Sequence, residues 1–325
     1  MKEFIIDQYN EGKNLFRFVK SVLPHLKNRE IFKLIRKEVI KVNDKKTDFN
    51  QKLNRNDKVK IFMNEKNFKK QKDNKFSSIK TNFEIIFEDK DIIVINKEMG
   101  ILVHPDKKEF KNTLSEMVKA YLYKKGEYKP NNFFNPAPCH RLDTNTSGII
   151  VFAKNHNALK KVNLLFKERE TIKLYRTIVY GKITTPILIT SMIDTTENEE
   201  NMVKVLDLKV YNIIPDKEKF LSENKFISAT KMIPIKYESQ YSLVDVELWT
   251  GKKHQIRAHL AAANHPILGD NKYFTKAGLS VSQLLGLKNY FLHAYKLILK
   301  GYGEWNAKFP EDFRQKAFEL FKYEM

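Results

Sequence analysis

The 325-residue chain contains a single cysteine, Cys139, and therefore cannot form an internal disulfide. A chain of this kind suits a reducing compartment. It also lacks any stretch close to the ~20 uninterrupted apolar residues that a membrane span needs, and its N-terminus has no apolar signal-peptide core. From these absences we expect a cytoplasmic protein that does not cross a membrane.

Motifs for common cofactors and metals are missing as well. The chain has no Gly-rich phosphate-binding loop and no cysteine pair. His254, His259 and His265 come nearest to a metal cluster, but their intervals of five and six residues do not place them on one helical face. Cys139 is followed by His140, yet adjacent residues rarely orient as a nucleophilic dyad. We therefore expect no metal and no cofactor.

Acidic side chains are outnumbered by basic ones. The chain has 59 Lys and Arg against 39 Asp and Glu, a formal net charge of +20. Such an excess points first to nucleic acid, and an anionic membrane surface is the rival partner. The excess is uneven, because residues 1–80 hold 22 Lys and Arg against 10 Asp and Glu. This asymmetry predicts a separate basic module at the front of the chain.

The front module is predicted to contain two short helices, over residues 14–23 and 28–39, separated by Pro24. Residues 39–42 and 58–62 indicate a small strand pair. The second helix has an apolar stripe, and its opposite face carries basic side chains that are candidates for RNA binding: Arg29, Lys33, Arg36 and Lys37. Such a face by itself is more often merely solvated.

Residues 64–80 have the polar composition of a solvated linker. From residue 81 onward short strands, among them one over residues 241–248, alternate with few helices, of which 156–168 is the clearest. We predict an α+β domain over residues 81–325, built on a mixed, mainly antiparallel sheet with flanking helices. A small α+β domain over residues 1–63 precedes it. The segment 205–235 is expected to be a surface excursion.

One carboxylate stands out by its surroundings. Asp143 follows Arg141 by two residues and precedes the turn Thr146-Ser147-Gly148, which leads into the apolar run 149–152. This run predicts a buried strand. An Asp in a loop is ordinarily a cap or part of an Asx turn. A carboxylate that lies before a central strand and close to fixed cations can instead be held ionised and oriented.

The string from His140 to Asp143, followed by Thr146-Ser147-Gly148 and an apolar strand, resembles the catalytic motif of the RluA-type pseudouridine synthases. Further stretches resemble other elements of that family, in the same order over residues 81 to about 310: 84–97 with 100–105, Lys173-Leu-Tyr175, 250–260 with 265–270, and Leu292-His-Ala294. Two departures are visible. Lys252 and Lys253 stand where the family usually has Arg-Thr, and residues 297–301 lack the usual trailing His-Pro.

The resemblance implies an RNA isomerase that detaches uracil from ribose, rotates it and rejoins it through carbon 5, without a cofactor. It implies that Asp143 is the nucleophile or proton abstractor and that Arg257 pairs with it. Tyr175 would stack on the target base, and Arg141 would fill the gap that the flipped base leaves in the RNA. Without this context Arg257 would be read as a surface salt bridge and Tyr175 as a core aromatic.

The front module resembles the S-four-type RNA-binding domain over about residues 12–63. Together the two resemblances imply a monomeric enzyme whose partner is large-subunit ribosomal RNA or its precursor particle. Lys252, Lys253 and His254 are further candidate RNA contacts. Two other functions are considered. A ribosome-assembly factor could keep the fold without useful catalysis, and an RNA hydrolase would need a metal or a paired acid and base near Asp143, neither of which is evident.

Overall fold

The structure, a computed structural model, describes residues 1–7, 10–64, 68, 76, 78–105, 109, 112–128, 134–196 and 202–325. Most of the predicted linker 64–80 lies outside these residues. The chain divides into two compact units. The small unit comprises Met1–Thr81, Glu116–Pro136 and Asn155–Asn157, and the large unit comprises the remainder.

The small unit begins with a three-stranded sheet and two helices. In chain order the elements are β1 (Lys2–Ile5), α1 (Leu15–Val22), α2 (Asn28–Arg36), β2 (Ile40–Val42) and β3 (Lys58–Ile61). The strands are ordered β1-β3-β2, and both pairs are antiparallel. The predicted helix pair and strand pair are thus confirmed. Strand β1 was not predicted, because its four residues carry no clear alternation and are mostly exposed.

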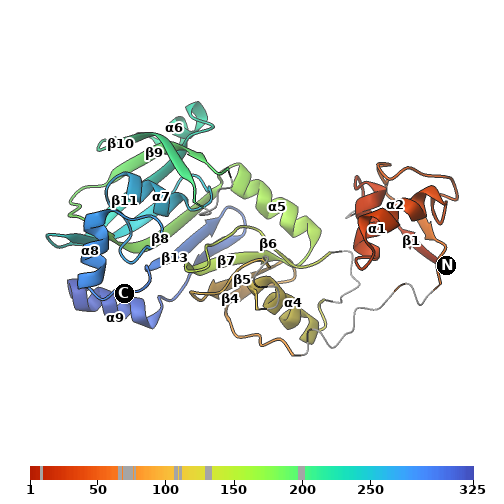
Figure 1. The fold of residues 1–325 in the computed structure, drawn as a ribbon, viewed down its shortest axis with the longest axis horizontal. Helices are drawn as coiled ribbons and strands as arrows, with labels where there is room; N and C mark the ends of the chain where they lie inside the picture. The colour runs from red at the N-terminus through yellow and green to blue at the C-terminus, as the bar shows by residue number, and fades with distance from the viewer. Residues whose placement is uncertain are drawn as a thin grey trace. The chain divides into compact units, whose positions relative to one another are not determined.

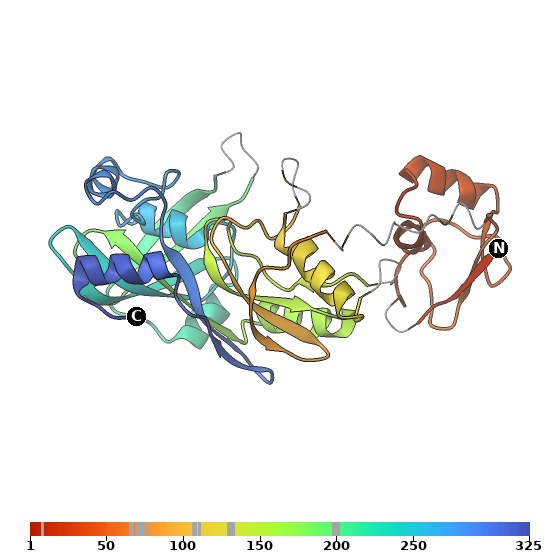
Figure 2. The ribbon, with the colours of Figure 1, turned by 90° about the horizontal axis from the view of Figure 1, so that it is seen from below.

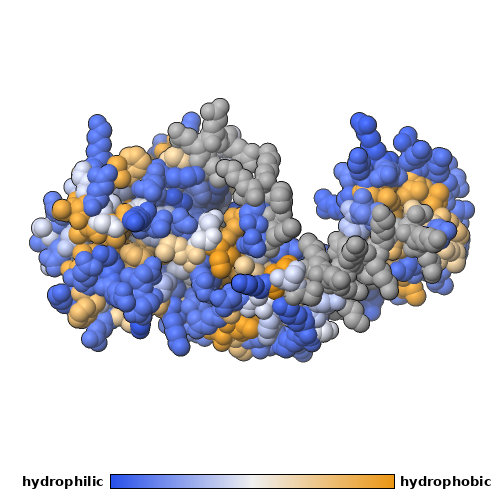
Figure 3. All heavy atoms as spheres, turned by 60° about the horizontal axis from the view of Figure 1, so that its bottom comes forward, coloured by the Kyte–Doolittle hydropathy of each residue, from blue (hydrophilic) through white to orange (hydrophobic). Residues whose placement is uncertain are grey.

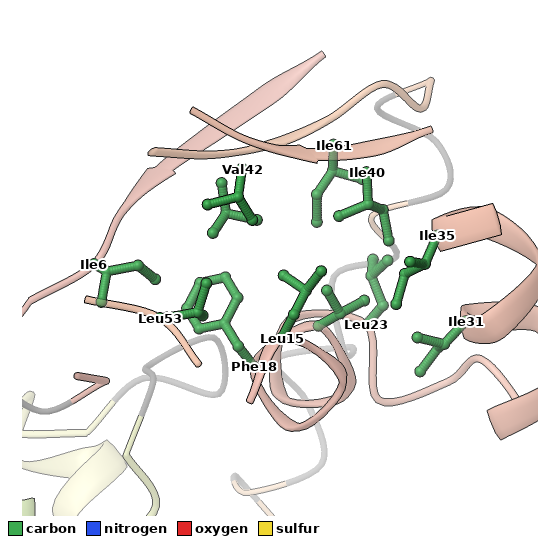
Figure 4. Packing of buried hydrophobic residues seen from close by; sticks show 12 residues of the cluster. Ile6, Leu15, Phe18, Leu23, Ile31, Ile35, Ile40, Val42, Leu53 and Ile61 are labelled. Atoms are coloured by element: carbon green, nitrogen blue, oxygen red, sulfur yellow. The ribbon is translucent and has the colours of Figure 1, made fainter. Parts of the chain in front are cut away.

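The core of this part is formed by apolar side chains that both helices and the sheet direct inward (Figure 4). Asn14 caps α1, its side chain accepting from the Arg17 backbone N–H at 2.9 Å. Helix α2 buries Ile31 and Ile35 and ends at Arg36, three residues earlier than predicted. The end is early because Glu38 adopts a left-handed conformation, with φ of 56°, that turns the chain toward β2.

The large unit is organised around one sheet, whose main path runs β10-β9-β11-β12-β8-β13-β7-β5-β4, with β14 beside β13 and β6 beside β7 (Figure 1). The strands are β4 (Glu84–Glu88), β5 (Ile92–Lys97), β6 (Ala137–Pro138), β7 (Ser147–Ala153), β8 (Thr171–Tyr180), β9 (Ile187–Asp194), β10 (Lys204–Tyr211), β11 (Ser228–Tyr237), β12 (Tyr241–Leu248), β13 (Leu292–Leu299) and β14 (Gly303–Asn306).

The sheet is mixed and mainly antiparallel, as predicted. Among the strand pairs of the described residues, β7 with β13 is the parallel one, and it joins the two halves of the sheet. The predicted strand over 149–152 is confirmed as the buried β7, which already includes Ser147 and Gly148 of the expected turn. Strand β12 has the bounds predicted for it.

The expectation of a surface excursion over 205–235 is wrong. This segment contains β10, helix α6 (Lys217–Glu223) and β11, and β11 lies between β9 and β12 within the sheet. The first half of β11 is mostly buried, but Pro234 and the lysines at 231 and 236 obscure the period-two pattern of a strand. Cross-strand pairing, which a single sequence does not show, determines this strand.

The other helices are α4 (Leu114–Lys124), α5 (His156–Lys167), α7 (Gln255–Ala262), α8 (Lys276–Leu284) and α9 (Glu311–Phe321). Helix α5 matches the prediction and buries Ala158 and Val162. Helix α7 packs on β9, β10 and β11. Helix α9 contributes Phe313 and Phe321 to a cluster with residues of β8 and β12, so that it covers part of the sheet (Figure 2).

None of the helices in the described part of the chain is long and apolar enough to cross a membrane. The face drawn in Figure 3 is largely hydrophilic, with apolar side chains reaching the surface in small groups. This agrees with a chain of which 30% of the residues are charged.

Candidate active site

Asp143 lies in the loop between β6 and β7, and the backbone of this loop is tightly fixed. The backbone carbonyl of Asp143 accepts from the Thr146 N–H at 3.0 Å, which closes a turn immediately before β7. Gly148 has φ of +110°, and a Cβ added there would lie 2.3 Å from the Ala294 carbonyl oxygen of β13. Only glycine permits this close approach of β7 to β13. The end of the loop that leads into β7 is therefore fixed against β13, in the middle of the sheet.

The loop is held from the other side by a buried lysine. The Lys97 ammonium, at the end of β5, donates to the carbonyls of Glu98, Ile101 and Thr144, each at 2.9 Å. Burial lowers the pKa of Lys97 to about 7, while the negative charge of Asp143 acts in the opposite direction. Three carbonyl acceptors match the three N–H bonds of an ammonium. Lys97 thus connects the segment after β5 to the residue that follows Asp143.

Arg257 of α7 contacts two carboxylates. Its Nη1 lies 3.1 Å from Asp143 Oδ2, while Nε and Nη2 bind Asp270 as a fork at 2.6 and 2.9 Å. The Asp270 side chain is fully buried, whereas 26% of the Asp143 side chain is exposed. Asp270 therefore orients the guanidinium, and Asp143 is the carboxylate that a substrate can reach.

Two tyrosine rings enclose the same guanidinium. The Arg257 Cζ lies 5.0 Å from the ring centre of Tyr273 and 4.7 Å from that of Tyr290. Burial alone would lower the pKa of Arg257, but its hydrogen bonds to Asp270 and the surrounding negative charge raise that pKa overall. The arginine is a permanently charged and sterically fixed partner for Asp143.

His254 lies on the other side of Asp143, with Nε2 3.9 Å from Oδ1. It is the N-cap residue of α7, in a left-handed conformation, and directly precedes the helix. Its Nδ1 lies 2.9 Å from the Tyr273 hydroxyl, which accepts from the Val203 N–H at 2.7 Å. The phenol can satisfy both contacts by donating to Nδ1, which leaves the proton of a neutral His254 on Nε2, facing Asp143. Burial lowers the pKa of His254, which favours this neutral form.

Tyr175 of β8 is 6% exposed. Burial raises the pKa of its phenol far above the usual range, and the negative charge of Asp143 adds to the effect. The phenol therefore stays protonated at any physiological pH. The structure thus brings Tyr175, Arg257 and His254 together around Asp143, from segments that are far apart in the chain.

The remaining candidates lie on the surface. Arg141 and Lys252 are exposed, and Lys253 is partly exposed. In the small unit the four basic side chains of the 28–37 segment are exposed on the side of α2 away from its buried residues: Arg29, Lys33, Arg36 and Lys37.

The three histidines considered for metal binding do not converge. His259 is fully buried, and its two ring nitrogens contact Ser191 at 2.8 Å and Thr230 at 2.9 Å. Within the described residues, no group of His, Cys, Asp and Glu has the arrangement of a metal site. Burial raises the pKa of the Cys139 thiol to about 12, and the Nε2 of His140 accepts from the Val151 N–H. Neither residue is arranged for nucleophilic catalysis.

Four residues of this site were not singled out from the sequence: Lys97, Asp270, Tyr273 and Tyr290. Asp270 ends the motif stretch 265–270, and a carboxylate between the apolar Ile267-Leu268 and the adjacent Lys272-Tyr273 was a usable signal. The others carried none, because a lysine at a strand end and tyrosines in loops are common at protein surfaces.

Comparisons with known proteins give one consistent result. Residues 91–262 match the family described as RNA pseudouridylate synthase. An uncharacterized RNA pseudouridine synthase of Mycoplasma genitalium is 30% identical over 99% of this chain and 98% of its own length. The ribosomal large subunit pseudouridine synthase D of Blochmanniella floridana is 28% identical over 99% of each chain.

The fold is also found in a solved structure. Human RNA pseudouridylate synthase domain containing 4 superposes with a TM-score of 0.54 and 23% identity, covering 74% of this chain and 94% of that one. At this identity the similarity concerns the fold alone. The matched range 91–262 includes Asp143, Tyr175 and Arg257, and Asp270 lies beyond it.

Proposed function

Because this chain belongs to the RNA pseudouridylate synthase family, whose members are isomerases acting on RNA, we propose that it converts uridines to pseudouridine in large-subunit ribosomal RNA. Support for this substrate comes from the large-subunit enzyme of Blochmanniella floridana, which is similar to this chain over its full length. The proposal includes action in the cytoplasm, by a monomer, on free RNA or a precursor ribosomal particle.

The observation that carries the chemical part of the proposal is the asymmetry between two carboxylates on one guanidinium. Asp270 is buried and bound by the fork of Arg257, whereas Asp143 is partly exposed and contacts a single nitrogen of Arg257, Nη1. Asp143 therefore keeps lone pairs free for a substrate while Arg257 fixes its orientation. We assign Asp143 as the nucleophile or proton abstractor, and Arg257 as the residue that orients it.

Tyr175 and Arg141 are assigned to the target nucleotide. A uridine must leave the RNA stack before its base can be detached, at an unstacking cost of a few kcal/mol. The buried ring of Tyr175 offers a face for the uracil beside Asp143, and it keeps its proton because of its raised pKa. The exposed Arg141, two residues before Asp143, can enter the gap left in the RNA.

We assign residues 1–63 as an S-four-like RNA-binding domain and residues 81–325 as the catalytic domain. Support comes from the independent core of the small sheet and its two helices, and from the exposed basic side of α2. The exposed Lys252 and partly exposed Lys253, next to His254, are assigned to RNA phosphates near the active site.

The test is a map of pseudouridines in total RNA from cells with and without this protein. We expect individual pseudouridines of large-subunit rRNA to disappear and to return when the gene is restored. Losses confined to tRNA would contradict the proposed substrate. An unchanged map together with a defect in ribosome assembly would favour the assembly factor considered above.

A further inference from the structure

The buried and partly buried lysines of the large unit differ in the acceptors that surround their ammonium groups. The Lys97 ammonium is enclosed by three carbonyls, and Lys154 binds Glu88 at 2.9 Å and the Asp89 carbonyl at 2.7 Å. Lys173 has no carboxylate or hydrogen-bond acceptor among the residues that the structure describes. The contact it makes is with the ring of Phe166, whose centre lies 5.6 Å from Nζ. A partly buried ammonium without an acceptor is unfavourable until an anion reaches it.

Lys173 lies close to the candidate active site. It belongs to β8 and shares a sheet face with Tyr175, two residues further on, which places their side chains roughly 7 Å apart along the strand. A Cβ added at Gly251, in the turn before α7, would lie 3.1 Å from Lys173 Nζ. Because residue 251 is a glycine, no side chain covers the ammonium from this direction.

The groups that face Lys173 come from several surrounding elements. The ring of His140, in the segment before Asp143, packs against Phe166, and burial together with the charge of Lys173 lowers the pKa of His140 to about 3, so it is neutral. Lys217 of α6 binds Glu247 at 2.7 Å. Burial, followed by the charge of Lys217, lowers the pKa of Lys173 to about 8. Lys173 is therefore mostly protonated at neutral pH.

We propose that Lys173 binds a backbone phosphate of the RNA next to the uridine that reacts. The phosphate would sit against the ammonium over Gly251, and the adjoining base would occupy the Tyr175 side of β8. This inference rests on the proposed placement of the target base at Tyr175. A phosphate beside the flipped nucleotide is the contact that such a site needs, because it fixes the register of the RNA and carries no base specificity.

The experiment compares full-length wild type, Lys173→Met and Lys173→Arg, with Lys300→Met as the matched control. Lys300 has an exposed side chain and pairs with Glu170, so its removal takes away the same charge at another place. The ligand is unmodified large-subunit rRNA transcribed in vitro. The dissociation constant is measured by filter binding between about 50 and 200 mM salt, a range in which phosphate-mediated affinity responds strongly.

Lys173→Met is expected to weaken binding several-fold and to reduce the slope of log affinity against log salt by about 0.7–0.9, the contribution of one neutralised phosphate. Lys173→Arg keeps the slope, and Lys300→Met resembles wild type. Affinity of the wild type falls as pH rises through about 8, where Lys173 loses its proton. This fall is absent in Lys173→Arg, because a guanidinium stays charged.

An unchanged slope in Lys173→Met, or a pH dependence that persists in Lys173→Arg, would overturn the inference. A fall in kcat with unaltered RNA affinity would do the same, since a phosphate contact made in the bound complex must contribute to affinity. The arginine variant keeps the test valid if the methionine variant misfolds. Failure of the proposed function is seen separately, as the absence of tritium release from 5-tritiated uridine of the same RNA by wild type.

Discussion

The basic side chains of α2, in the small unit, and the charged side chains around Asp143, in the large unit, lie in opposite environments. In the small unit, the basic side chains of α2 are exposed, as is Lys37 directly after it. Ile31 and Ile35 are the buried residues that anchor this helix to the core. In the large unit, Lys97, Arg257 and Asp270 are almost completely buried, and each has partners in fixed geometry.

This difference separates two uses of charge. Exposed cations attract the RNA backbone, act almost interchangeably and are screened by salt. Buried charges act through position, because each must be matched by a specific partner, and removing one leaves that partner uncompensated. Substitutions of the buried charges around Asp143 should therefore affect stability and rate, while those on α2 should affect salt-dependent affinity.

The largest effect on stability is expected for Arg257→Met. The substitution leaves the fully buried Asp270 without its counter-ion, which costs about 3–5 kcal/mol of unfolding free energy. Arg257→Lys costs less, because an ammonium restores the charge without the planar fork. Urea unfolding and single-turnover tritium release measure the two consequences. Equal stability of the wild type and Met variant would show that Asp270 is not held by this pair.

Lys97→Met is expected to cost about 1–3 kcal/mol, because three carbonyls around the Asp143 loop lose the hydrogen bond from the ammonium, and only that of Thr144 keeps another donor among the described residues, the Gly100 N–H. The matched control is Lys154→Met. This substitution removes a lysine that binds Glu88 near the start of β5, whereas Lys97 lies at the end of that strand. Both variants should unfold at lower urea concentration, but only Lys97→Met should slow tritium release. A similar reduction of rate in both would mean that general destabilisation explains the effect.

Tyr273→Phe tests whether the Tyr273 hydroxyl orients His254 toward Asp143. Removing the hydroxyl leaves His254 Nδ1 and the Val203 N–H without their shared partner, at a cost of about 1 kcal/mol. We expect a several-fold lower single-turnover rate with unchanged RNA affinity. Nitrogen-15 NMR of the imidazole should report the proton on Nε2 in wild type. A proton found on Nδ1 would refute the proposed arrangement.

The smallest effect on turnover is expected for the triple substitution of Lys33, Arg36 and Lys37 by Gln. Binding to long rRNA should weaken, and its salt slope should fall by up to about one unit for each phosphate that is no longer neutralised, while stability stays near that of wild type. Substituting the exposed Lys300, Lys308 and Lys322 by Gln removes the same number of charges elsewhere and provides the control for charge alone. If both variants reduce the slope equally, α2 has no particular role in RNA binding.

The sequence predicted those parts that depend on local pattern. Helix α5, the buried β7 and the strand β12 each have a clear periodicity, and the sheet class followed from them. It did not predict β11 as an internal strand or β1 as an edge, because a strand's place in the sheet depends on pairing that a single sequence does not show. The residues around Asp143 likewise fall into those that local motifs predict and those that depend on contacts distant in the sequence.

Asp143, Tyr175 and Arg257 were named from motifs, and the structure brings them together. Asp270, Lys97 and Tyr273 were not, because their importance lies in burial and in partners up to 70 residues distant. The single-nitrogen contact of Arg257 with Asp143, beside its fork to Asp270, could not be foreseen either. Pairing geometry of this kind arises only when the sheet and α7 are assembled.

The measurement that tests this account most directly is single-turnover tritium release from unmodified large-subunit rRNA by wild type and Asp143→Asn. The Asn side chain preserves the shape of Asp143 and removes its charge, so RNA affinity should stay within a few-fold of wild type. The rate should fall by roughly a thousandfold or more, as is typical when a nucleophile is removed. If Asp143→Asn keeps more than a few per cent of the wild-type rate, Asp143 is not the catalytic carboxylate.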